Sequence, residues 1–310
     1  MTLQNSSQPN FAVCLAAFNG RNWIAEQLHS ILNQQGVAVT VFVSVDQSQD
    51  GTEQFVDAMS LLDSRICLLP HGKYFGGAAR NFYRLLREID FEKFDYVSLA
   101  DQDDVWFADK LHRAHLQMQE SFADAYSSNV VAFWNDGRDV LIQKAQAQTE
   151  WDFLFEAAGP GCTYVLRRSL AIDIQDALGL QWDAVQQVGL HDWFIYAFAR
   201  SKGYRWFIDN RPGMRYRQHG NNQVGVNYGV YATFRRARKI INGWGIQQSQ
   251  LIAKLLGLEQ VGFVKIWFAG GRWGIFRLAW YAPRCRRVAS DKVLFAVSCV
   301  VLALTKGVTW

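Results

Sequence analysis

Carboxylates cluster directly after an apolar segment in the first third of the chain. Residues 96–100 read YVSLA, and Asp101, Asp103 and Asp104 follow at once. Carboxylates this close repel one another unless a cation lies between them. Oxygen ligands of this kind suit Mg²⁺ or Mn²⁺, which bind one or two protein carboxylates and complete their shell with phosphate oxygens and water. The cluster therefore predicts a divalent metal site that acts on a phosphate ester.

A second acidic segment, DQSQDGT, begins at Asp46 after another apolar run. Each segment has a second interpretation, because aspartate is a favoured N-cap residue and a carboxylate at a helix start stabilises the helix without any ligand. Asp104 or Asp109 is the candidate cap in the first segment. The residues by themselves leave both interpretations open.

The elements around these segments alternate between strand and helix. β-Branched and apolar runs predict buried strands, and apolar residues at helical spacing predict amphipathic helices. Such alternation is typical of a doubly wound, mostly parallel α/β sheet, whose ligands bind beyond the carboxyl ends of the strands. The expected strands span residues 11–17, 37–45, 66–69, 96–100 and 162–166, and the expected helices span 22–32, 52–61, 78–89 and 193–200.

Composition indicates a globular intracellular protein. The chain has 310 residues, about half of them apolar, which is enough for a substantial core. Its five cysteines form no CxxC pair, so a reducing cytoplasm is expected. The polar N-terminus does not resemble a secretory signal, and the apolar run 293–305 is shorter than the roughly 20 residues that a spanning helix needs.

Charge is distributed unevenly along the chain. Residues 227–310 contain thirteen Lys and Arg against only Glu259 and Asp291, a net charge of +11, while residues 1–226 carry −7. Clustered cations attract anionic surfaces. Amphipathic helices that combine these cations with Trp and Phe predict peripheral attachment to an anionic membrane, on the inner face of the cell membrane. The alternative is that these helices pack on the rest of the chain or on a second subunit.

Four segments together resemble family 2 glycosyltransferases: VCLAAFNG, SVDQSQDGT, GKYFGGAARNF and SLADQDDVW. The resemblance implies a GT-A-type, Rossmann-like fold with a C-terminal helical, basic extension. It also implies an inverting transfer from a nucleotide diphosphate sugar with Mn²⁺ or Mg²⁺. By the same resemblance, the donor-binding residues are Ala17, Asn19, Asp46, Arg80, Asn81, Asp101 and Gln102.

The resemblance also suggests individual roles. It implies that Asp46 accepts a hydrogen bond from a pyrimidine base, that Asp101 contacts ribose or metal, and that Asp103 is the principal metal ligand. Gln47 stands where the family usually has a second acidic residue, so the nucleotide stays open among dTDP, UDP and GDP.

The segment VGLHDWFIYAFARSKG places Asp192 at a predicted helix start, where the family usually carries its catalytic base. A base is needed because an acceptor hydroxyl is a poor nucleophile until a carboxylate takes its proton. A single displacement then inverts the anomeric carbon. The alternative role for Asp192 is that of an N-cap.

The segment MRYRQHGNNQVG contains His219, for which the resemblance implies a metal or diphosphate contact, and Arg215 and Arg217 are candidate diphosphate contacts. Together with DQDDVW and HDW, this segment resembles the rhamnosyltransferase-like branch that builds bacterial surface polysaccharides such as the O-antigen of lipopolysaccharide. The resemblance covers residues 10–225. It implies dTDP-rhamnose as donor and a glycan or lipid-linked oligosaccharide as acceptor.

Three regions are expected: a donor-binding half at 8–125, an acceptor-binding half with the base at 126–226, and the basic extension at 227–310. No nucleic-acid partner is expected. Two other functions stay open, namely a sugar nucleotidyltransferase and a catalytically idle sugar- or membrane-binding adaptor of the same fold. The single glycine in FNGRNW disfavours the nucleotidyltransferase, which usually has a glycine-rich phosphate loop after its first strand.

Overall fold

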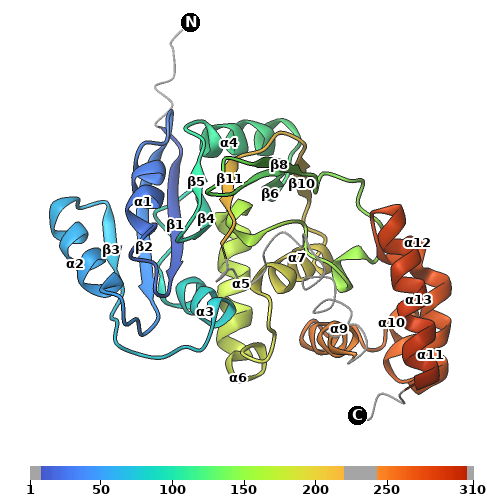
Figure 1. Cartoon of the computed structure of the whole chain (residues 1–310). Helices are drawn as coiled ribbons and strands as arrows, with labels where there is room; N and C mark the ends of the chain where they lie inside the picture. Colours follow the sequence, from blue (N-terminus) through green and yellow to red (C-terminus); the bar gives the residue numbers. More distant parts are fainter. Residues whose placement is uncertain (1–7, 220–242, 306–310) are drawn as a thin grey trace, which may run out of the picture.

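A computed structural model of the protein describes residues 8–219 and 243–305. Its centre is a seven-stranded sheet with the order β10-β6-β9-β4-β1-β2-β3 (Figure 1). The strands of this sheet are β1 (Asn10–Ala17), β2 (Ala38–Val45), β3 (Ile66–Leu68), β4 (Tyr96–Asp101), β6 (Ala125–Ser128), β9 (Val165–Arg167) and β10 (Trp206–Asp209).

Neighbouring strands run parallel except at β9, which pairs antiparallel with β4 and β6. The mostly parallel sheet expected from the sequence is therefore confirmed. The expected strand at 162–166 is wrong at its start, because residues Gly161–Thr163 form a 3₁₀ turn, η2, and β9 begins at Val165. Pro160 explains the difference, since its carbonyl accepts both the backbone N–H and the hydroxyl of Thr163 and closes a turn there.

The central strands are apolar because both of their faces are covered. On β1, Ala12 and Cys14 belong to one buried cluster, whereas Phe11, Val13 and Leu15 belong to another. The first cluster lies under α3, α5 and α7, and the second under α1, α2 and α4. These helices are α1 (Ile24–Leu32), α2 (Thr52–Leu62), α3 (Ala78–Glu88), α4 (Lys110–Glu120), α5 (Arg168–Leu180), the short α6 (Trp182–Val185) and α7 (His191–Ser201).

A smaller sheet has the order β5-β11-β7-β8. Its strands are β5 (Val105–Trp106), β7 (Val130–Phe133), β8 (Asp139–Ile142) and β11 (Met214–Arg217). Strand β11 pairs antiparallel with β5, which brings residues 214–217 beside the segment that follows β4. Because β6, β9 and β10 belong to the large sheet, the expected donor and acceptor halves share one sheet rather than forming separate bodies.

The C-terminal part is helical, as the sequence predicts. Its elements are α9 (Trp244–Leu255), α10 (Gly262–Phe268), α11 (Gly271–Leu278), the 3₁₀ turn η3 (Ala279–Tyr281), α12 (Ala282–Cys285) and α13 (Ala289–Thr305). Ile252, Trp267 and Ile275 belong to the same buried cluster as α3, α5 and α7, so these helices pack on the helices that cover one face of the large sheet. The expected boundary at 226/227 and the basic segment 234–239 lie outside the described residues.

Within the described ranges, no helix combines the length and apolar character that crossing a membrane requires.

Two glycines allow α10 and α11 to approach closely. A Cβ added at Gly274 would lie 2.6 Å from the Ile266 carbonyl oxygen and 3.0 Å from the Trp267 Cα, both of which are backbone atoms that cannot swing aside. Gly270 faces the same carbonyl. The contact between these helices therefore depends on the absence of a side chain.

We expect Gly274→Ala to lower the free energy of unfolding by about 1–3 kcal/mol, because the added methyl overpacks a backbone contact. Gly179→Ala is the matched control, since Gly179 also lies in a helix but its Cβ would meet no atom within 4 Å. That control should gain roughly 0.5–1 kcal/mol. Denaturant unfolding of both variants measures the difference, and equal stability of the two would contradict the packing argument.

Candidate active site

The carboxyl edge of the large sheet opens into a cleft of about 1000 Å³. The register places Ala16 of β1 beside Asp101 of β4, and Ala17 beside Val45, which precedes Asp46. The two acidic segments therefore meet at one edge, as predicted from the sequence. Most predicted site residues line the cleft, namely Ala17, Asn19, Asp46, Asn81, Asp101, Gln102, Asp103, Asp192 and His219.

Asp46 organises the glycine turn that precedes α3. Its carboxylate accepts the backbone N–H groups of Phe75 at 2.7 Å and Gly76 at 3.1 Å, as well as that of Gln47. Gly76 and Gly77 have φ angles of 85° and 135°, which favour glycine. Asp46 thus positions the loop on one wall of the cleft while remaining only 3% exposed.

Asn81 and Asn19 fix the strand ends rather than project freely. The amide of Asn81 donates to the carbonyls of Ala17 and Ser44 at the ends of β1 and β2, and its buried Oδ1 has no hydrogen-bond partner among the described residues. Asn19 has a positive φ of 47°, and its side chain accepts the N–H of Gln49. Both residues support the backbone on this side of the cleft.

Gln102 joins the first acidic cluster to the end of β1. Its side-chain amide exchanges two hydrogen bonds of 2.8 Å with the backbone N–H and carbonyl of Phe18. A Cβ at Gly20 would lie 2.0 Å from the Gln102 Oε1, so glycine is needed at this position for Gln102 to make both hydrogen bonds. Arg80, by contrast, is exposed, is not among the cleft-lining residues and donates to the Gln186 carbonyl.

Asp101 and Asp104 are carboxylates with strongly perturbed acidity. Burial, reinforced by the negative charge of Asp103, raises the pKa of Asp101 to about 7. The same causes raise the pKa of Asp104 well above its ordinary value. Asp104 is fully buried, and its Oδ2 has no hydrogen-bond partner within the described ranges. Such carboxylates favour a nearby cation because it would offset both their burial and their mutual repulsion.

One buried cation already lies beside this cluster. Lys110 is fully buried, donates to the Cys162 carbonyl at 2.9 Å and lies over the Trp106 ring. Burial lowers the pKa of Lys110 and raises that of the Cys162 thiol. Although Cys162 brings its sulfur within 4.8 Å of carboxylate oxygens of Asp101 and Asp104, a protonated thiol is a poor ligand for Mg²⁺ or Mn²⁺.

Asp103 and His219 are brought together across the chain. The His219 Nε2 lies 2.7 Å from the Asp103 Oδ2, and the imidazole stacks on Trp23 with ring centroids 4.2 Å apart. Both side chains are about one-seventh exposed and face the cleft. A carboxylate oxygen and an imidazole nitrogen thus converge at the mouth of the acidic cluster.

The two arginines of β11 lie next to this pair but are not among the cleft-lining residues. Arg217 donates to the Asp103 carbonyl at 2.8 Å, and its backbone N–H donates to the Asp104 carboxylate. Arg215 forms an ion pair with Asp139 on the smaller sheet. Arg217 therefore positions the acidic segment, and Arg215 holds two strands together.

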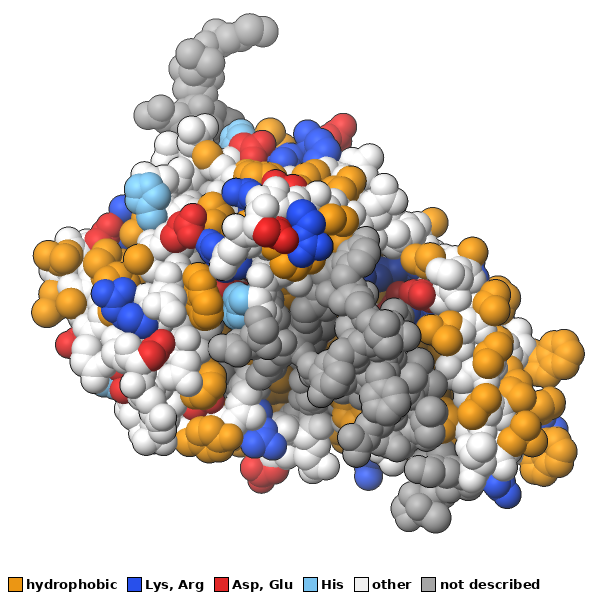
Figure 2. Space-filling model, in the orientation of Figure 1, with side chains coloured by type: hydrophobic (Ala, Val, Ile, Leu, Met, Phe, Trp, Pro, Cys, Tyr) orange, Lys and Arg blue, Asp and Glu red, His pale blue; other side chains and the backbone are white. Residues whose placement is uncertain are grey.

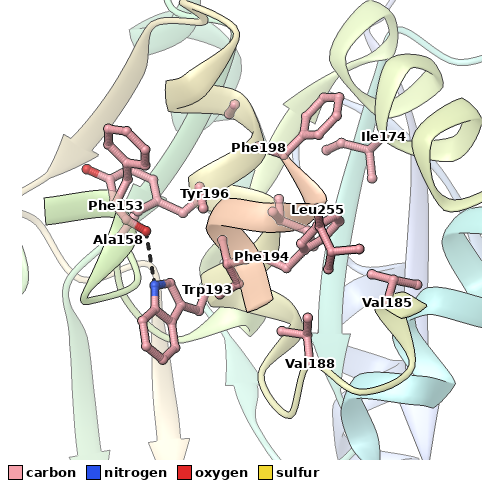
Figure 3. Close-up of a cluster of buried hydrophobic side chains, with 14 of the residues drawn as sticks. Phe153, Ala158, Ile174, Val185, Val188, Trp193, Phe194, Tyr196, Phe198 and Leu255 are labelled. Carbon is pink, nitrogen blue, oxygen red and sulfur yellow. Dashed lines mark hydrogen bonds between the residues drawn. The ribbon is translucent and has the colours of Figure 1, made fainter. Parts of the chain in front are cut away.

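Asp192 lies at the start of α7, on the opposite wall of the cleft. The helix is buried along residues Trp193–Ala199, and the Trp193 indole donates to the Phe153 carbonyl at 3.0 Å (Figure 3). Burial raises the pKa of Asp192 to about 6, although the Trp193 N–H and Lys144 act in the opposite direction. Asp192 is therefore rigidly held and largely ionised near neutral pH.

The η2 turn, which precedes β9, packs against the start of α7. A Cβ at Gly161 would lie 2.4 Å from the His191 Nε2 and 3.2 Å from the Asp192 Cβ, so glycine is needed there. Burial lowers the pKa of His191 to about 3, and the neutral ring stacks on Phe82 at 4.0 Å. The Tyr164 hydroxyl accepts the Ala158 N–H and donates to the Asp192 carbonyl, which ties the turn to the helix.

Sequence reasoning missed the cationic side of the cleft. Lys144, Arg286 and Arg287 line it, although they come from the β8 loop and the segment between α12 and α13. The two arginines form ion pairs with Glu156. Lys144 forms no side-chain hydrogen bond or ion pair with any residue that the structure describes. Single positive charges so distant in sequence carry no local pattern that distinguishes them from surface lysines and arginines.

The cleft brings together an acidic cluster suited to a phosphate-bound cation and, at the start of α7, a carboxylate suited to proton abstraction. Together with the mixed sheet flanked by helices, this is the arrangement that the resemblance to family 2 glycosyltransferases implies, a GT-A-type fold.

Comparison with known proteins agrees. Residues 12–239 match the family described as Glycosyl transferase family 2. The chain is 41% identical over 280 residues to dTDP-rhamnosyl transferase RfbG of Shigella flexneri, covering 90% of this chain and 96% of that protein. The chain therefore belongs to glycosyl transferase family 2.

Two more distant proteins extend the comparison. The Escherichia coli protein named UDP-Glc:alpha-D-GlcNAc-diphosphoundecaprenol beta-1,3-glucosyltransferase WfgD is 27% identical over 165 residues, covering 51% of this chain and 60% of that protein. The mannosyltransferase PcManGT of Pyrobaculum calidifontis, solved with GDP-Man and Mn²⁺, superposes with a TM-score of 0.52 at 17% identity, covering 97% and 88% of the chains. This structural likeness shows the fold.

The pKa of Asp192 predicts the pH dependence of turnover. Only the ionised carboxylate accepts a proton, so kcat/KM should fall as pH drops below about 6. Lys144 lowers this pKa, and Lys144→Met should therefore move the acid limb of the pH profile to higher pH. Lys202→Met removes an exposed lysine at the other end of α7 and should leave the limb in place. An unchanged limb in Lys144→Met would contradict the electrostatic coupling.

Proposed function

We propose that this enzyme transfers rhamnose from dTDP-rhamnose to a hydroxyl of a glycan or lipid-linked oligosaccharide, with inversion at the anomeric carbon. The observation that carries the proposal is the single cleft in which Asp192 faces the Asp101–Asp104 cluster. Support for the sugar and nucleotide comes from the name of the Shigella flexneri relative, to which 90% of the chain aligns. O-antigen polysaccharide is the corresponding product class.

The donor occupies the end of the cleft at β1, β2 and β4 in this proposal. Asp46 and the Phe75–Gly77 turn hold the base, and the strand-end backbone at Ala17 and Asn19 contacts the nucleoside. Asn81 and Gln102 support these segments through their hydrogen bonds to the backbone. We assign Arg80 and Arg217 positioning roles, because each donates to a loop carbonyl rather than to the cleft.

Asp192 acts on the acceptor. Its carboxylate takes the proton of the acceptor hydroxyl while that oxygen forms a bond to the anomeric carbon. The bond from the anomeric carbon to the donor phosphate oxygen breaks, and the electron pair leaves with the nucleoside diphosphate. Attack from the side opposite the leaving group inverts the anomeric centre.

We propose that Asp103 and His219, with Asp101, hold a divalent cation, Mn²⁺ or Mg²⁺. The donor set fits in kind, because the Asp103 Oδ2 and the His219 Nε2 lie 2.7 Å apart at the cleft, and Asp101, whose pKa is raised by burial and by its acidic neighbour, lines the same cleft. Such a cation stabilises negative charge on a leaving diphosphate. Arg217 keeps the Asp103 segment in place by donating to its carbonyl.

We further propose that the reaction takes place at the inner face of the cell membrane, in the cytoplasm. All five cysteines are free thiols, which suits a reducing compartment. A lipid-linked acceptor is supported by the name of the Escherichia coli relative, which specifies a diphosphoundecaprenol acceptor for that protein. Family membership favours this function over the sugar nucleotidyltransferase and the idle adaptor.

We expect purified protein to bind dTDP-rhamnose in the presence of Mn²⁺ or Mg²⁺ more tightly than UDP- or GDP-linked sugars, as measured by titration calorimetry.

Asp103→Ala should weaken metal-dependent donor binding by roughly tenfold or more. Even residues that only hydrogen-bond to a metal ligand typically change metal affinity by this much when they are mutated. Asp139→Ala, which removes an acid that pairs only with Arg215 in the described ranges, is the control and should bind normally. Equal donor affinity in wild type and Asp103→Ala would refute the metal assignment.

Asp192→Asn keeps the shape of the side chain and removes its basicity. It should leave donor binding within about twofold of wild type while lowering kcat by roughly 10²–10⁴, the usual contribution of general base catalysis. Steady-state transfer assays and donor titration together separate the two effects. A variant that loses donor affinity but retains kcat would assign Asp192 to binding instead.

A further inference from the structure

Two tryptophans project from the C-terminal helices. Trp273 on α11 and Trp280 on η3 are 75% and 78% exposed. They lie at i and i+7, so they occupy the same side of the helical segment, whereas Ile275 and Leu278 point into the core. Exposed tryptophans on one side of a helix carry a free-energy cost in water that burial elsewhere would remove.

Helix α13 presents a matching apolar stripe. Val293, Val297, Val301 and Leu304 follow one another at spacings of four, four and three residues, and each is at least 36% exposed. The opposite side of the helix, with Cys299 and Leu302, is buried. Helix α11 packs on α13, and Figure 2 shows the hydrophobic side chains gathered over these helices at the right-hand edge of the molecule. We call these six residues the apolar face.

Cations border the apolar face. Arg272 donates to the Leu304 carbonyl at 3.0 Å, which ties its guanidinium to the end of the α13 stripe. Arg277 lies at i+4 from Trp273 and is exposed. Neither arginine forms an ion pair with an acid in the described part of the chain. Residues 243–305 contain eight Lys and Arg against Glu259 and Asp291.

We propose that the apolar face docks the enzyme on the interface of an anionic phospholipid bilayer. Apolar residues combined with tryptophan and unpaired arginine are complementary to such an interface, where the rings enter the headgroup region and the cations meet lipid phosphate. Charge complementarity favours a bilayer over a second copy of this chain, because a symmetric contact would bring the arginine-rich faces together. No spanning segment is needed, since the face lies along the surface.

Helix α13 also connects the apolar face to the catalytic cleft. Its inner side lines an apolar pocket of about 150 Å³ that includes Leu294, Phe295 and Leu302. Phe155 and Trp193 line both this pocket and the cleft. Leu294 is itself 40% exposed. The Arg286–Asp291 ion pair also lines both the pocket and the cleft, so the boundary between them is partly apolar and partly charged. Access of a lipid-linked acceptor from the bilayer along this boundary rests on the proposed function, whereas the docking itself does not.

Co-sedimentation with vesicles tests the docking. Wild-type protein should bind phosphatidylcholine vesicles that contain about one third phosphatidylglycerol, and bind less as salt is raised. The double variant Trp273→Gln/Trp280→Gln should lose binding by roughly tenfold or more. Leu61→Gln/Leu62→Gln is the matched control, because these leucines on α2 are 84% and 81% exposed but far from the cationic helices in sequence. The control should bind as wild type does.

A second pair of variants separates charge from apolar contact. Arg272→Gln/Arg277→Gln should lose the preference for anionic over neutral vesicles while keeping its thermal stability. The proposal is overturned if wild-type protein does not sediment with anionic vesicles, or if the tryptophan variant binds them as well as wild type does. It is also overturned if, without vesicles, sedimentation velocity shows a dimer for the wild type and a monomer for the tryptophan variant. The last result would identify the face as a protein interface.

Assays with a water-soluble acceptor distinguish this inference from the proposed function. The tryptophan variant should transfer sugar to such an acceptor at the wild-type rate and lose activity only toward acceptor embedded in anionic vesicles. Absence of any transfer by the wild type would contradict the proposed function and leave the vesicle-binding result standing.

Discussion

Repulsion among carboxylates in a partly buried cleft is the constraint on which the site depends. Asp101 and Asp104 resist ionisation because they are buried beside Asp103, while Lys110 lies under the cluster and donates to a carbonyl rather than to a carboxylate. A fold that gathers these groups gives up stability for binding, as functional sites commonly do. In the proposed function, a cation and a diphosphate that enter the cleft together would reduce this cost, and donor binding would then be coupled to the metal.

Asp192, the proposed base, lies on a different element from the acidic cluster, although its charge is still among the causes that raise the pKa of Asp101. Asp192 belongs to a helix buried on all sides, and its pKa is raised by burial while Lys144 counters the shift. Carboxylates from two different elements thus line a single cleft, which suits the proposed division between a cluster that binds a cation and a carboxylate that accepts a proton. Gly161 makes the arrangement sterically feasible, because any side chain there would displace His191 and Asp192.

The buried strands and the edge at which they end were predictable, because two-sided burial leaves apolar runs and parallel strands end together. Asp46, Asp103 and Asp192 were therefore placed near one another from local patterns. The η2 turn and the cationic side of the cleft were not, since they depend on pairings between distant segments, and the Asp103–His219 contact was expected only from the family resemblance. Arg80 was expected near the donor by resemblance, and Arg215 and Arg217 were candidate diphosphate contacts; the structure gives these three arginines carbonyl and carboxylate partners.

The stereochemistry of transfer tests the central claim most directly, because a single displacement assisted by Asp192 has only one outcome. Nuclear magnetic resonance of the first-formed glycoside, recorded before any equilibration, reports the configuration of the transferred anomeric carbon. The arrangement of one base opposite a diphosphate-binding cluster predicts a configuration opposite to that of the donor. A product with the donor's configuration would require a second nucleophile or a front-face route, and it would contradict the assignment of Asp192 as the base.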